Sequence, residues 1–363
     1  MITDKWQFWL GGGVSVGLLI LLFYQVDLGK LKDALGDANY ALLAPSVAIY
    51  FVAVWFRAAR WRYLLAPISS IPVRRLYPVV TMGYMANNLL PIRLGEVVRS
   101  YLLARQEKLS TSSALATIAV ERVYDGITLL AFAALSAPWL LLLGEFDSAA
   151  EVSHTTGVLF LIAAISAFAM LLTFFTLLGS SVVFANRIEG FLNIVPAGPR
   201  PKVKEIFRTF VAGLAILNSP GKHLALFVYS LPVWLLEGSM YFMLAYSFGI
   251  DEHFDSLGVL LLVVLLLTAT SNLATSIPSA IGGIGPFEVV AQKTLIALGV
   301  GPELALGYSG FVHLVALWLP VNIAGLALLL KNNLSLREMT SARRTGGFET
   351  ASGLASETTG EGH

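Results

Sequence analysis

The sequence contains no cysteine. Disulfide bonds, thiolate metal sites and thiol nucleophiles are therefore excluded. The five histidines show no spacing typical of metal ligands, and neither a G-x-S-x-G nucleophile elbow nor a Walker A phosphate loop is present. The sequence accordingly predicts no metal, no cofactor and no catalytic residues, and it favours a protein that is not an enzyme.

Charge is scarce as well. Only 13% of the 363 residues are Asp, Glu, Lys or Arg, about half the fraction of a typical soluble domain. Hydrophobic residues make up 56%, the mean hydropathy is +0.74, and apolar runs of membrane-spanning length recur from residue 6 to residue 330. The net charge of +1 gives no indication of a nucleic-acid partner. This composition predicts an all-α fold, a polytopic integral membrane helical bundle.

Six segments are apolar and long enough to cross a bilayer, and two more are hydrophobic but interrupted by proline, glycine or charge. The six are 6–26, 40–57, 114–143, 156–179, 223–248 and 304–330, and the interrupted segments are 76–106 and 257–299. We expect residues 1–331 to form one membrane-embedded domain. Residues 332–363 are polar and rich in Gly, Ser and Thr, which is typical of a disordered tail.

Lysine and arginine are concentrated in two connections, 57–75 and 180–223, whereas 144–155 and 249–257 contain acidic residues and neither Lys nor Arg. The positive-inside rule places the two basic connections in the cytoplasm. This arrangement requires each interrupted segment to enter and leave on one side. Residues 76–106 would then form a re-entrant hairpin from the cytoplasm and 257–299 one from outside. The alternative is that both interrupted segments cross completely.

The two interrupted segments resemble each other. In "NNLLPIRLGE" and in "TSNLATSIPSAIGGIGPFE" a polar, Asn-containing stretch leads to proline, then glycine, then glutamate. Proline and clustered glycine prevent a continuous helix, and the freed backbone groups survive in a bilayer only when buried in protein or beside a wet cavity. Paired interruptions in two halves of a chain are typical of transporters with an inverted repeat and a site between the halves.

We therefore expect the substrate site at the two interruptions. The helices that restart there present free N–H groups and partial positive charge, which suit an anionic ligand, and two arginines add full charge. The predicted substrate-binding residues are Asn88, Arg93, Glu96, Arg99, Gly282, Gly283, Gly285 and Glu288. The predicted structural or coupling residues are Pro91, Gly95, Glu121, Arg122, Asp125, Glu237 and Pro278.

The stretch "ERVYD" contributes a third group of charges. Glu121 and Asp125 are four residues apart and Arg122 and Asp125 three apart, so they share one helix face. Two interpretations stay open: a structural clamp that locks helices together, or a part of the functional site. Glu237 lies near the middle of its expected span and should face the interior, in a structural or a proton-linked role.

Residues 200–217, "RPKVKEIFRTFVAGLAIL", have apolar residues at the i, i+3, i+4, i+7 spacing of an amphipathic helix, with basic residues mostly off that stripe. This helix either lies in the cytoplasmic interface near anionic headgroups or packs on the inner rim of the bundle.

Three stretches resemble the signature blocks of a known family, in matching order and spacing. They are "LLPIRLGEVVR" (89–99), "ERVYD" (121–125) and "IPSAIGGIGPFE" (277–288). Over about residues 5–330 the chain is similar to the flippase-like membrane domain of lysylphosphatidylglycerol synthases. That domain also occurs in stand-alone membrane proteins and fused to some archaeal polyprenyl-linked glycosyltransferases.

The resemblance implies lipid translocation. In the synthases this domain is assigned the movement of aminoacylated phosphatidylglycerol between leaflets, whereas a separate cytoplasmic domain makes that lipid. This sequence shows no such domain, so we expect a flippase or scramblase for a phospholipid or a polyprenyl-phosphate lipid. The alternative is an intramembrane enzyme, or an enzyme partner, that acts on a lipid-linked substrate through Glu96, Asp125 or Glu288 as acid or base.

The expected partners are membrane lipids with an anionic headgroup, and a homodimer or a complex with a lipid-modifying enzyme are further alternatives. The expected location is the cytoplasmic membrane of a prokaryote, with the N- and C-termini in the cytoplasm.

Overall fold

The computed structural model describes residues 6–24, 26–90, 93–146, 162, 166, 169–170, 172–196, 198–275 and 281–331. These residues form helices and their connections, and no β-strand occurs among them. The expected tail 332–363, Pro91, Pro278 and much of the expected span 156–179 lie outside the described residues.

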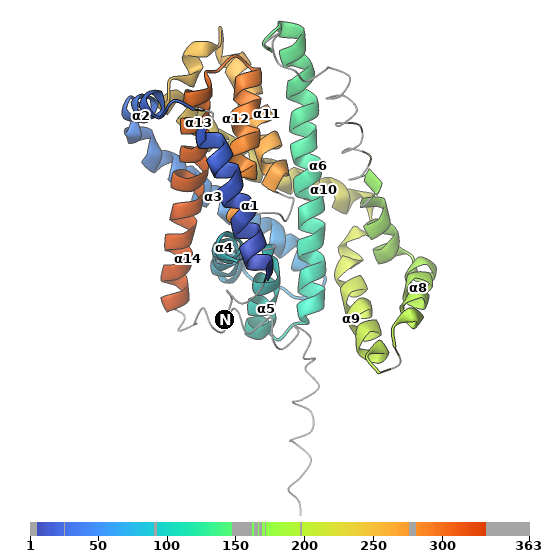
Figure 1. Cartoon of the computed structure of the whole chain (residues 1–363). Coiled ribbons are helices and arrows are strands. Elements are labelled where there is room, and N and C mark those ends of the chain that lie inside the picture. The colour runs from blue at the N-terminus through green and yellow to red at the C-terminus, as the bar shows by residue number, and fades with distance from the viewer. Residues whose placement is uncertain are drawn as a thin grey trace, which may run out of the picture.

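The described helices are shown in Figure 1. They are α1 (Trp6–Tyr24), α2 (Leu28–Gly36), α3 (Leu43–Leu65), α4 (Val73–Leu89), α5 (Gly95–Glu107), α6 (Thr111–Leu143), α8 (Val182–Phe191), α9 (Arg200–Gly213), α10 (Pro220–Ser247), α11 (Leu257–Thr275), α12 (Pro286–Ala297), α13 (Pro302–Gly310) and α14 (Leu319–Lys331). A short 3-10 turn, η7 (Ile281–Gly283), precedes α12, and a π-helical stretch, η8 (Phe311–Trp318), joins α13 to α14.

Five helical segments of the described chain are long and apolar enough to cross a membrane. They are Tyr40–Leu65, Thr111–Leu143, Pro220–Ser247, Leu257–Thr275 and Pro302–Lys331. Four of them cover expected spans, and α1 occupies the first expected span with 19 residues. The prediction of a helical membrane bundle is thus confirmed. The largest difference lies at α3, which continues beyond the expected end at residue 57 to Leu65.

Each interrupted segment forms a pair of packed helices. α4 and α5 lie together in the lower half of the molecule as drawn, and α11 and α12 in the upper half (Figure 1). The hydroxyl groups of Thr270, near the end of α11, and Thr294, on α12, lie 3.1 Å apart within hydrogen-bonding distance. Because α11 alone is long enough to cross a membrane, the hairpin at 257–299 has one long arm and one short arm of 12 residues.

Glycine allows the close packing of α4 on α5. A Cβ atom on Gly95 would lie 2.5 Å from the backbone nitrogen of Asn87, and one on Gly83 would lie 2.9 Å from Cβ of Arg99. Any larger side chain at either position would force the two helices apart.

The tips of the two hairpins meet inside the bundle. η7 packs on α4, and a Cβ atom on Gly282 would lie 2.9 Å from the carbonyl oxygen of Asn88, near the end of α4. The same Cβ would lie 2.9 Å from Nε1 of Trp318 in η8. This meeting point brings together residues from both halves of the sequence, as an arrangement of paired interruptions requires.

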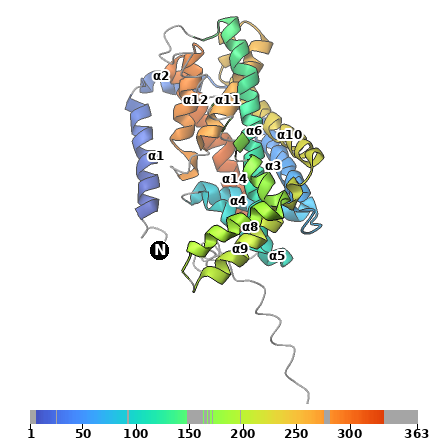
Figure 2. The ribbon, with the colours of Figure 1, turned by 90° about the vertical axis from the view of Figure 1, so that its right-hand side faces the viewer.

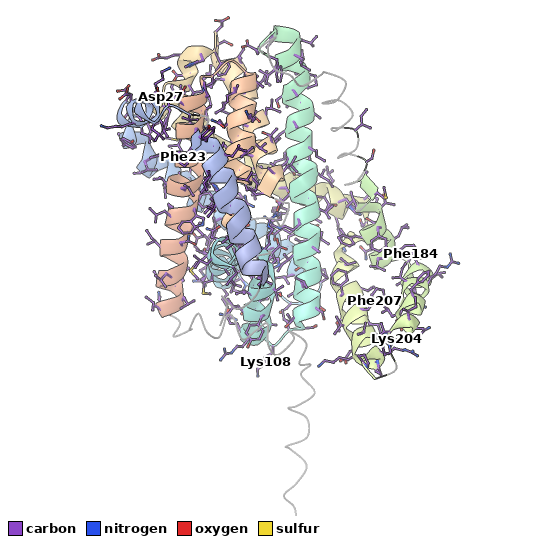
Figure 3. All side chains as sticks on the ribbon, viewed as in Figure 1. Phe23, Asp27, Lys108, Phe184, Lys204 and Phe207 are labelled. Carbon is purple, nitrogen blue, oxygen red and sulfur yellow. The ribbon has the colours of Figure 1, made fainter. Side chains whose placement is uncertain are left out.

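α9 lies beside the lower part of α6, and α8 packs on α9 on the side away from α6 (Figure 1 and Figure 2). The hydroxyl of Ser113 on α6 donates to the carbonyl oxygen of Thr209 on α9 at 2.7 Å. This contact agrees with the alternative in which residues 200–217 pack on the rim of the bundle. Lys108 and Lys204 lie at the lower end of the molecule and Asp27 at the upper end (Figure 3).

Candidate functional site

A cavity of about 470 Å³ lies where the hairpin tips meet. Its polar and charged lining residues are Tyr50, Arg57, Tyr84, Asn87, Asn88, Arg93, Glu96, Arg122, Asp125, Glu237, Asn272, Thr275 and His313. A stripe of α6 forms an apolar part of the wall: Ala119, Val123, Gly126 and Leu129. The cavity therefore offers charge on one side and a hydrocarbon surface on another, in a volume that suits a small ligand or a headgroup.

Two arginines of α3 are neutralised by acidic residues of other helices. Nη2 of Arg57 lies 2.5 Å from a carboxylate oxygen of Glu237 on α10, and the Arg57 guanidinium lies over the ring of Trp234. Nη1 of Arg60 lies 2.7 Å from Oδ1 of Asp125 on α6. The indole N–H of Trp234 donates to the same Asp125 oxygen at 3.0 Å. These contacts hold α3, α6 and α10 together around the cavity.

Arg99 forms a third buried pair. Its two terminal nitrogens donate to the two oxygens of Glu121 at 2.9 and 2.8 Å, and its guanidinium lies 3.7 Å from the ring centre of Trp61. Arg122 lies 2.6 Å from Glu121 and 3.6 Å from Glu96. The predicted clamp at Glu121–Asp125 therefore exists as a network that joins α3, α5 and α6. Arg122 and Asp125 also line the cavity, so the interpretation of "ERVYD" as a part of the functional site stays open.

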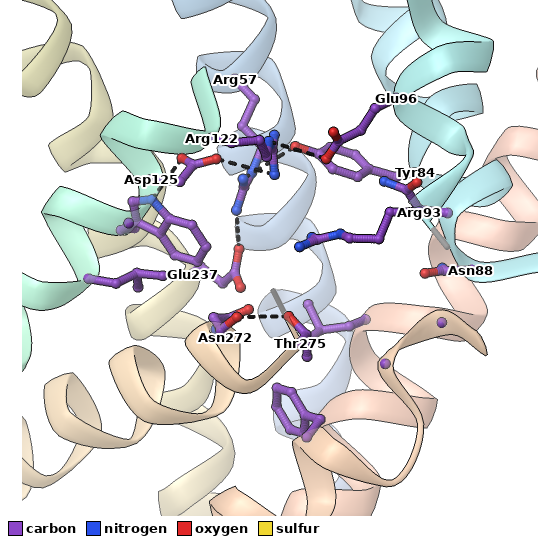
Figure 4. Close-up of a pocket in the computed structure, with 18 of the residues that line it drawn as sticks. Arg57, Tyr84, Asn88, Arg93, Glu96, Arg122, Asp125, Glu237, Asn272 and Thr275 are labelled. Carbon is purple, nitrogen blue, oxygen red and sulfur yellow. Dashed lines mark hydrogen bonds and ion pairs between the residues drawn. The ribbon is translucent and has the colours of Figure 1, made fainter. Parts of the chain in front are cut away.

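Arg93 differs from these arginines. It sits in the turn between α4 and α5 with a φ of 50°, a left-handed conformation that is uncommon for a residue other than glycine. Figure 4 shows its side chain extending toward the centre of the cavity, in the direction of the Arg57–Glu237 pair. Within the described part of the chain its guanidinium forms no hydrogen bond and no ion pair. Among the described arginines in and around the cavity, Arg93 is thus the one without a carboxylate partner.

The cavity also contains hydrogen-bond donors without partners. Nε of Arg57 and Nε1 of Trp318 are buried and form no hydrogen bond among the described residues, and both residues line the cavity. A buried polar group without a partner costs roughly 1–3 kcal/mol. A ligand that brings several acceptor oxygens would satisfy these donors.

The two restarted helices differ at their N-termini. α5 begins after Leu94 with no side-chain cap, so its first N–H groups face the turn that carries Arg93. At α12, the carboxylate of Glu288 accepts the N–H of Gly285 at 2.6 Å and so caps its own helix. Of the two predicted helix N-termini, only that of α5 is left without a capping side chain.

The three glycines before α12, Gly282, Gly283 and Gly285, have different surroundings. All three have positive φ, and Gly282 and Gly283 line the cavity. Gly285 instead packs on α1, since a Cβ atom there would lie 3.0 Å from Leu18. Gly285, Glu288 and Arg99 are therefore predicted substrate-binding residues that the structure does not place in the cavity wall, whereas it brings Asn88, Arg93, Glu96, Gly282 and Gly283 together there.

Several cavity residues are absent from the predicted set. Arg57 lines the cavity and Arg60 lies behind its wall; the expected basic connection 57–75 contains both, but α3 continues through them and buries them. Their spacing of three residues, together with acidic residues in other expected spans, is the signal that could have revealed the ion pairs. Asn272 and His313 stand in apolar segments without a charged neighbour, and only the tertiary packing brings them to the cavity.

Comparison with known proteins gives the context of this site. The family model described as "Lysylphosphatidylglycerol synthase TM region" matches residues 8–324. The chain is 26% identical over 341 residues to the glycosyltransferase AglD of Haloferax volcanii, a match that covers 89% of this chain and 54% of that protein. The chain thus spans about half the length of that relative.

Two further relatives match over most of their length. A UPF0104 membrane protein of Methanothermobacter thermautotrophicus is 25% identical over 322 residues, with 85% of this chain and 90% of the relative covered. The UPF0104 membrane protein PH1989 of Pyrococcus horikoshii is 24% identical over 341 residues, with 88% and 95% covered. No solved structure matches significantly. The match to the family model over residues 8–324 includes both hairpins and every residue of the cavity wall. The chain therefore belongs to the family of the lysylphosphatidylglycerol synthase TM region.

Proposed function

We propose that this protein is a lipid translocator, a flippase or scramblase, which binds the phosphate of a phospholipid or a polyprenyl-phosphate-linked lipid in the cavity between its two hairpins. The observation that carries the proposal is the unpaired guanidinium of Arg93 in that cavity. Five arginines (Arg57, Arg60, Arg93, Arg99 and Arg122) face four carboxylates (Glu96, Glu121, Asp125 and Glu237). Within this set the charge of Arg93 has no carboxylate partner among the described residues, and a phosphodiester carries one negative charge. Glu288, which pairs with His313, is outside this set.

The shape of the cavity supports an amphiphilic ligand. The phosphate would bind Arg93, the N-terminus of α5 and the unpartnered donors of Arg57 and Trp318, since guanidinium and N–H groups are the usual partners of phosphate oxygens. The acyl or prenyl chain would follow the apolar stripe of α6. A lipid can be held in this way without exposing its headgroup to the hydrocarbon of the bilayer.

Lipid transport in reconstituted vesicles tests the proposal. Arg93→Ala should abolish or strongly reduce the movement of a fluorescent phospholipid between leaflets. Arg93→Lys should restore little, because lysine keeps the charge but lacks the planar fork that binds two phosphate oxygens. Arg75→Ala is the matched control, since Arg75 is an exposed arginine that pairs with Glu107 at the surface. Transport by Arg93→Ala at the wild-type rate would remove Arg93 from the site.

An intramembrane enzyme is the second candidate. It is favoured by the name of one relative, a glycosyltransferase, and by Glu96, a cavity carboxylate that is only half buried and whose arginine partner is 3.6 Å away. The other two carboxylates of the wall, Asp125 and Glu237, are held by arginines at 2.7 and 2.5 Å, which disfavours them as proton donors or acceptors. Glu96→Gln separates the candidates: turnover of a lipid-linked sugar that is lost in this variant would support the enzyme.

A further inference from the structure

A histidine and a glutamate form a second buried site beside the cavity. Nδ1 of His313, in the π-helical stretch η8, lies 2.6 Å from Oε1 of Glu288 on α12. The side chains are almost inaccessible, with 6% of His313 and 1% of Glu288 exposed, and the imidazole stacks on Phe287 at a centroid distance of 4.3 Å. π-Helical stretches often occur at functional sites, because the extra residue in the turn redirects side chains.

This pair is connected to both the cavity and the hairpin tip. His313 lines the cavity, and its Nε2 has no hydrogen-bond partner in the part of the chain that the structure describes. The second oxygen of Glu288 accepts the N–H of Gly285, and a Cβ atom on Gly283 would lie 3.7 Å from Cε1 of the histidine. The Glu288 carboxylate fixes the neutral imidazole as its Nδ1–H tautomer, so Nε2 is the atom that can take up a proton from cavity water.

Glu288 also differs from the other buried carboxylates. Glu121, Asp125 and Glu237 each have an arginine partner, whereas Glu288 has only His313 within the described residues. With a neutral imidazole the pair carries one negative charge beside the cavity. When Nε2 takes up a proton, the imidazolium and the carboxylate cancel, and the pair no longer opposes an anionic ligand.

The elements around the pair contribute further titratable or charged side chains. They are Tyr50 and Arg57 of α3, Tyr84 of α4, Arg93 of the α4–α5 turn, Glu237 and Tyr241 of α10, and Tyr308 of α13. Tyr241 packs edge-on against Phe287, and Tyr308 donates its hydroxyl proton to the carbonyl oxygen of Tyr241. α1 and α11 contribute no charged side chain in their described parts, and α14 has only Lys331 at its end. Apart from His313, none of these groups forms an ion pair with Glu288 among the described residues, so its charge balance depends on His313.

We propose that the Glu288–His313 pair is a proton-binding site linked to the anion site, so that each anionic headgroup bound at Arg93 is accompanied by uptake of a proton at Nε2 of His313. This inference rests on the proposed function. Coupling is reciprocal: if the proton favours the anion, the anion favours the proton to the same degree. Lipid affinity therefore rises as the pH falls, and a proton gradient across the membrane biases the direction of lipid movement.

Calorimetric titration of the full-length protein in detergent tests the linkage. The probe is dioctanoyl phosphatidylglycerol, whose phosphodiester stays ionised between pH 6 and 9. Titrations in two buffers of different ionisation enthalpy should reveal uptake of up to one proton per lipid. The affinity should fall by up to about tenfold per pH unit on the alkaline side. Binding with neither proton uptake nor pH dependence would overturn the linkage and leave the translocator proposal intact, whereas no binding at any pH would overturn both.

Two asparagine variants locate the proton. In His313→Asn the amide nitrogen replaces Nδ1 as the donor to Glu288 but cannot be protonated, so proton uptake and pH dependence should disappear. His223→Asn is the matched control, because His223 contacts Tyr124 and the carbonyl of Leu217 away from the cavity wall, and it should behave like the wild type. Unchanged uptake in His313→Asn would refute the site. If that variant fails to fold, Glu288→Gln serves in its place, because it removes the negative charge of the pair. The proton uptake measured on the wild-type protein still decides whether a linked proton exists.

Discussion

At the scale of single residues, the structure separates two arginines that the sequence places together. Arg93 and Arg99 belong to one charged stretch, and both were predicted to bind substrate. Arg99 instead pairs with Glu121 and lies against Trp61, whereas Arg93 faces the cavity without an ion-pair partner in the described part of the chain. The sequence reveals that such charges need a polar interior, but the partner of each charge depends on which helices pack together, and local spacing does not contain that information.

This difference predicts that alanine substitution of Arg99 lowers the stability of the protein and that alanine substitution of Arg93 does not. Arg99→Ala removes the arginine that donates to both oxygens of Glu121 and leaves that buried carboxylate with Arg122 and Arg60. Breaking a buried ion pair typically costs about 3–5 kcal/mol. Its melting temperature in detergent should fall by many degrees and its transport should fall with it. Arg93→Ala breaks no ion pair among the described residues and should melt close to the wild type. Equal melting temperatures for the two variants would contradict these roles.

At the scale of elements, the sequence predicts the two broken segments well. Both segments divide into two packed helices, and Gly282, Gly283 and Gly285, which precede α12, have positive φ. The sequence does not reveal how the glycines divide their roles. Gly285 packs on α1, and Glu288, which was expected to contact the ligand, caps α12 and binds His313. These roles arise from contacts with helices far away in the chain, and no local pattern encodes them.

Alanine substitutions test the division among the glycines. Gly285→Ala combines a strained backbone, at a φ of 101°, with a Cβ atom 3.0 Å from Leu18. Gly299→Ala is the matched control, because Gly299 has a φ of 84° but no atom within 4 Å of the added Cβ. A residue other than glycine in such a conformation costs roughly 1–3 kcal/mol. Gly285→Ala should therefore melt at a lower temperature than Gly299→Ala. Similar melting temperatures would show that α1 does not restrict the turn.

At the scale of the whole molecule, the account depends on the side from which each hairpin enters. Burial of Arg57 and Arg60 removes them from the first basic connection, yet Arg62, Arg74 and Arg75 remain there. The expected orientation therefore depends on fewer arginines than the sequence suggests, but the connection remains positively charged. The overall bundle was predictable from apolar run lengths, since a helix must satisfy its own backbone in the bilayer.

Cysteine labelling of this cysteine-free chain tests the orientation. Ser70 and Ser110 are exposed and flank the α4–α5 hairpin, so Ser70→Cys and Ser110→Cys should both react with an impermeant reagent from the cytoplasmic side. Ser256→Cys, at an exposed position before α11, should react only from outside. Labelling of positions 70 and 110 from opposite sides would eliminate the first re-entrant hairpin and with it the inverted repeat.

Native mass spectrometry of lipids that co-purify with the protein tests the central claim most directly, because it measures whether the unpaired charge of Arg93 holds a lipid phosphate. The wild-type protein and Arg75→Ala should retain a phosphate-bearing lipid through mild purification. Arg93→Ala should lose most of that lipid while it remains folded, and Arg93→Lys should retain an intermediate amount. Equal lipid occupancy in Arg93→Ala and in the wild type would contradict the account.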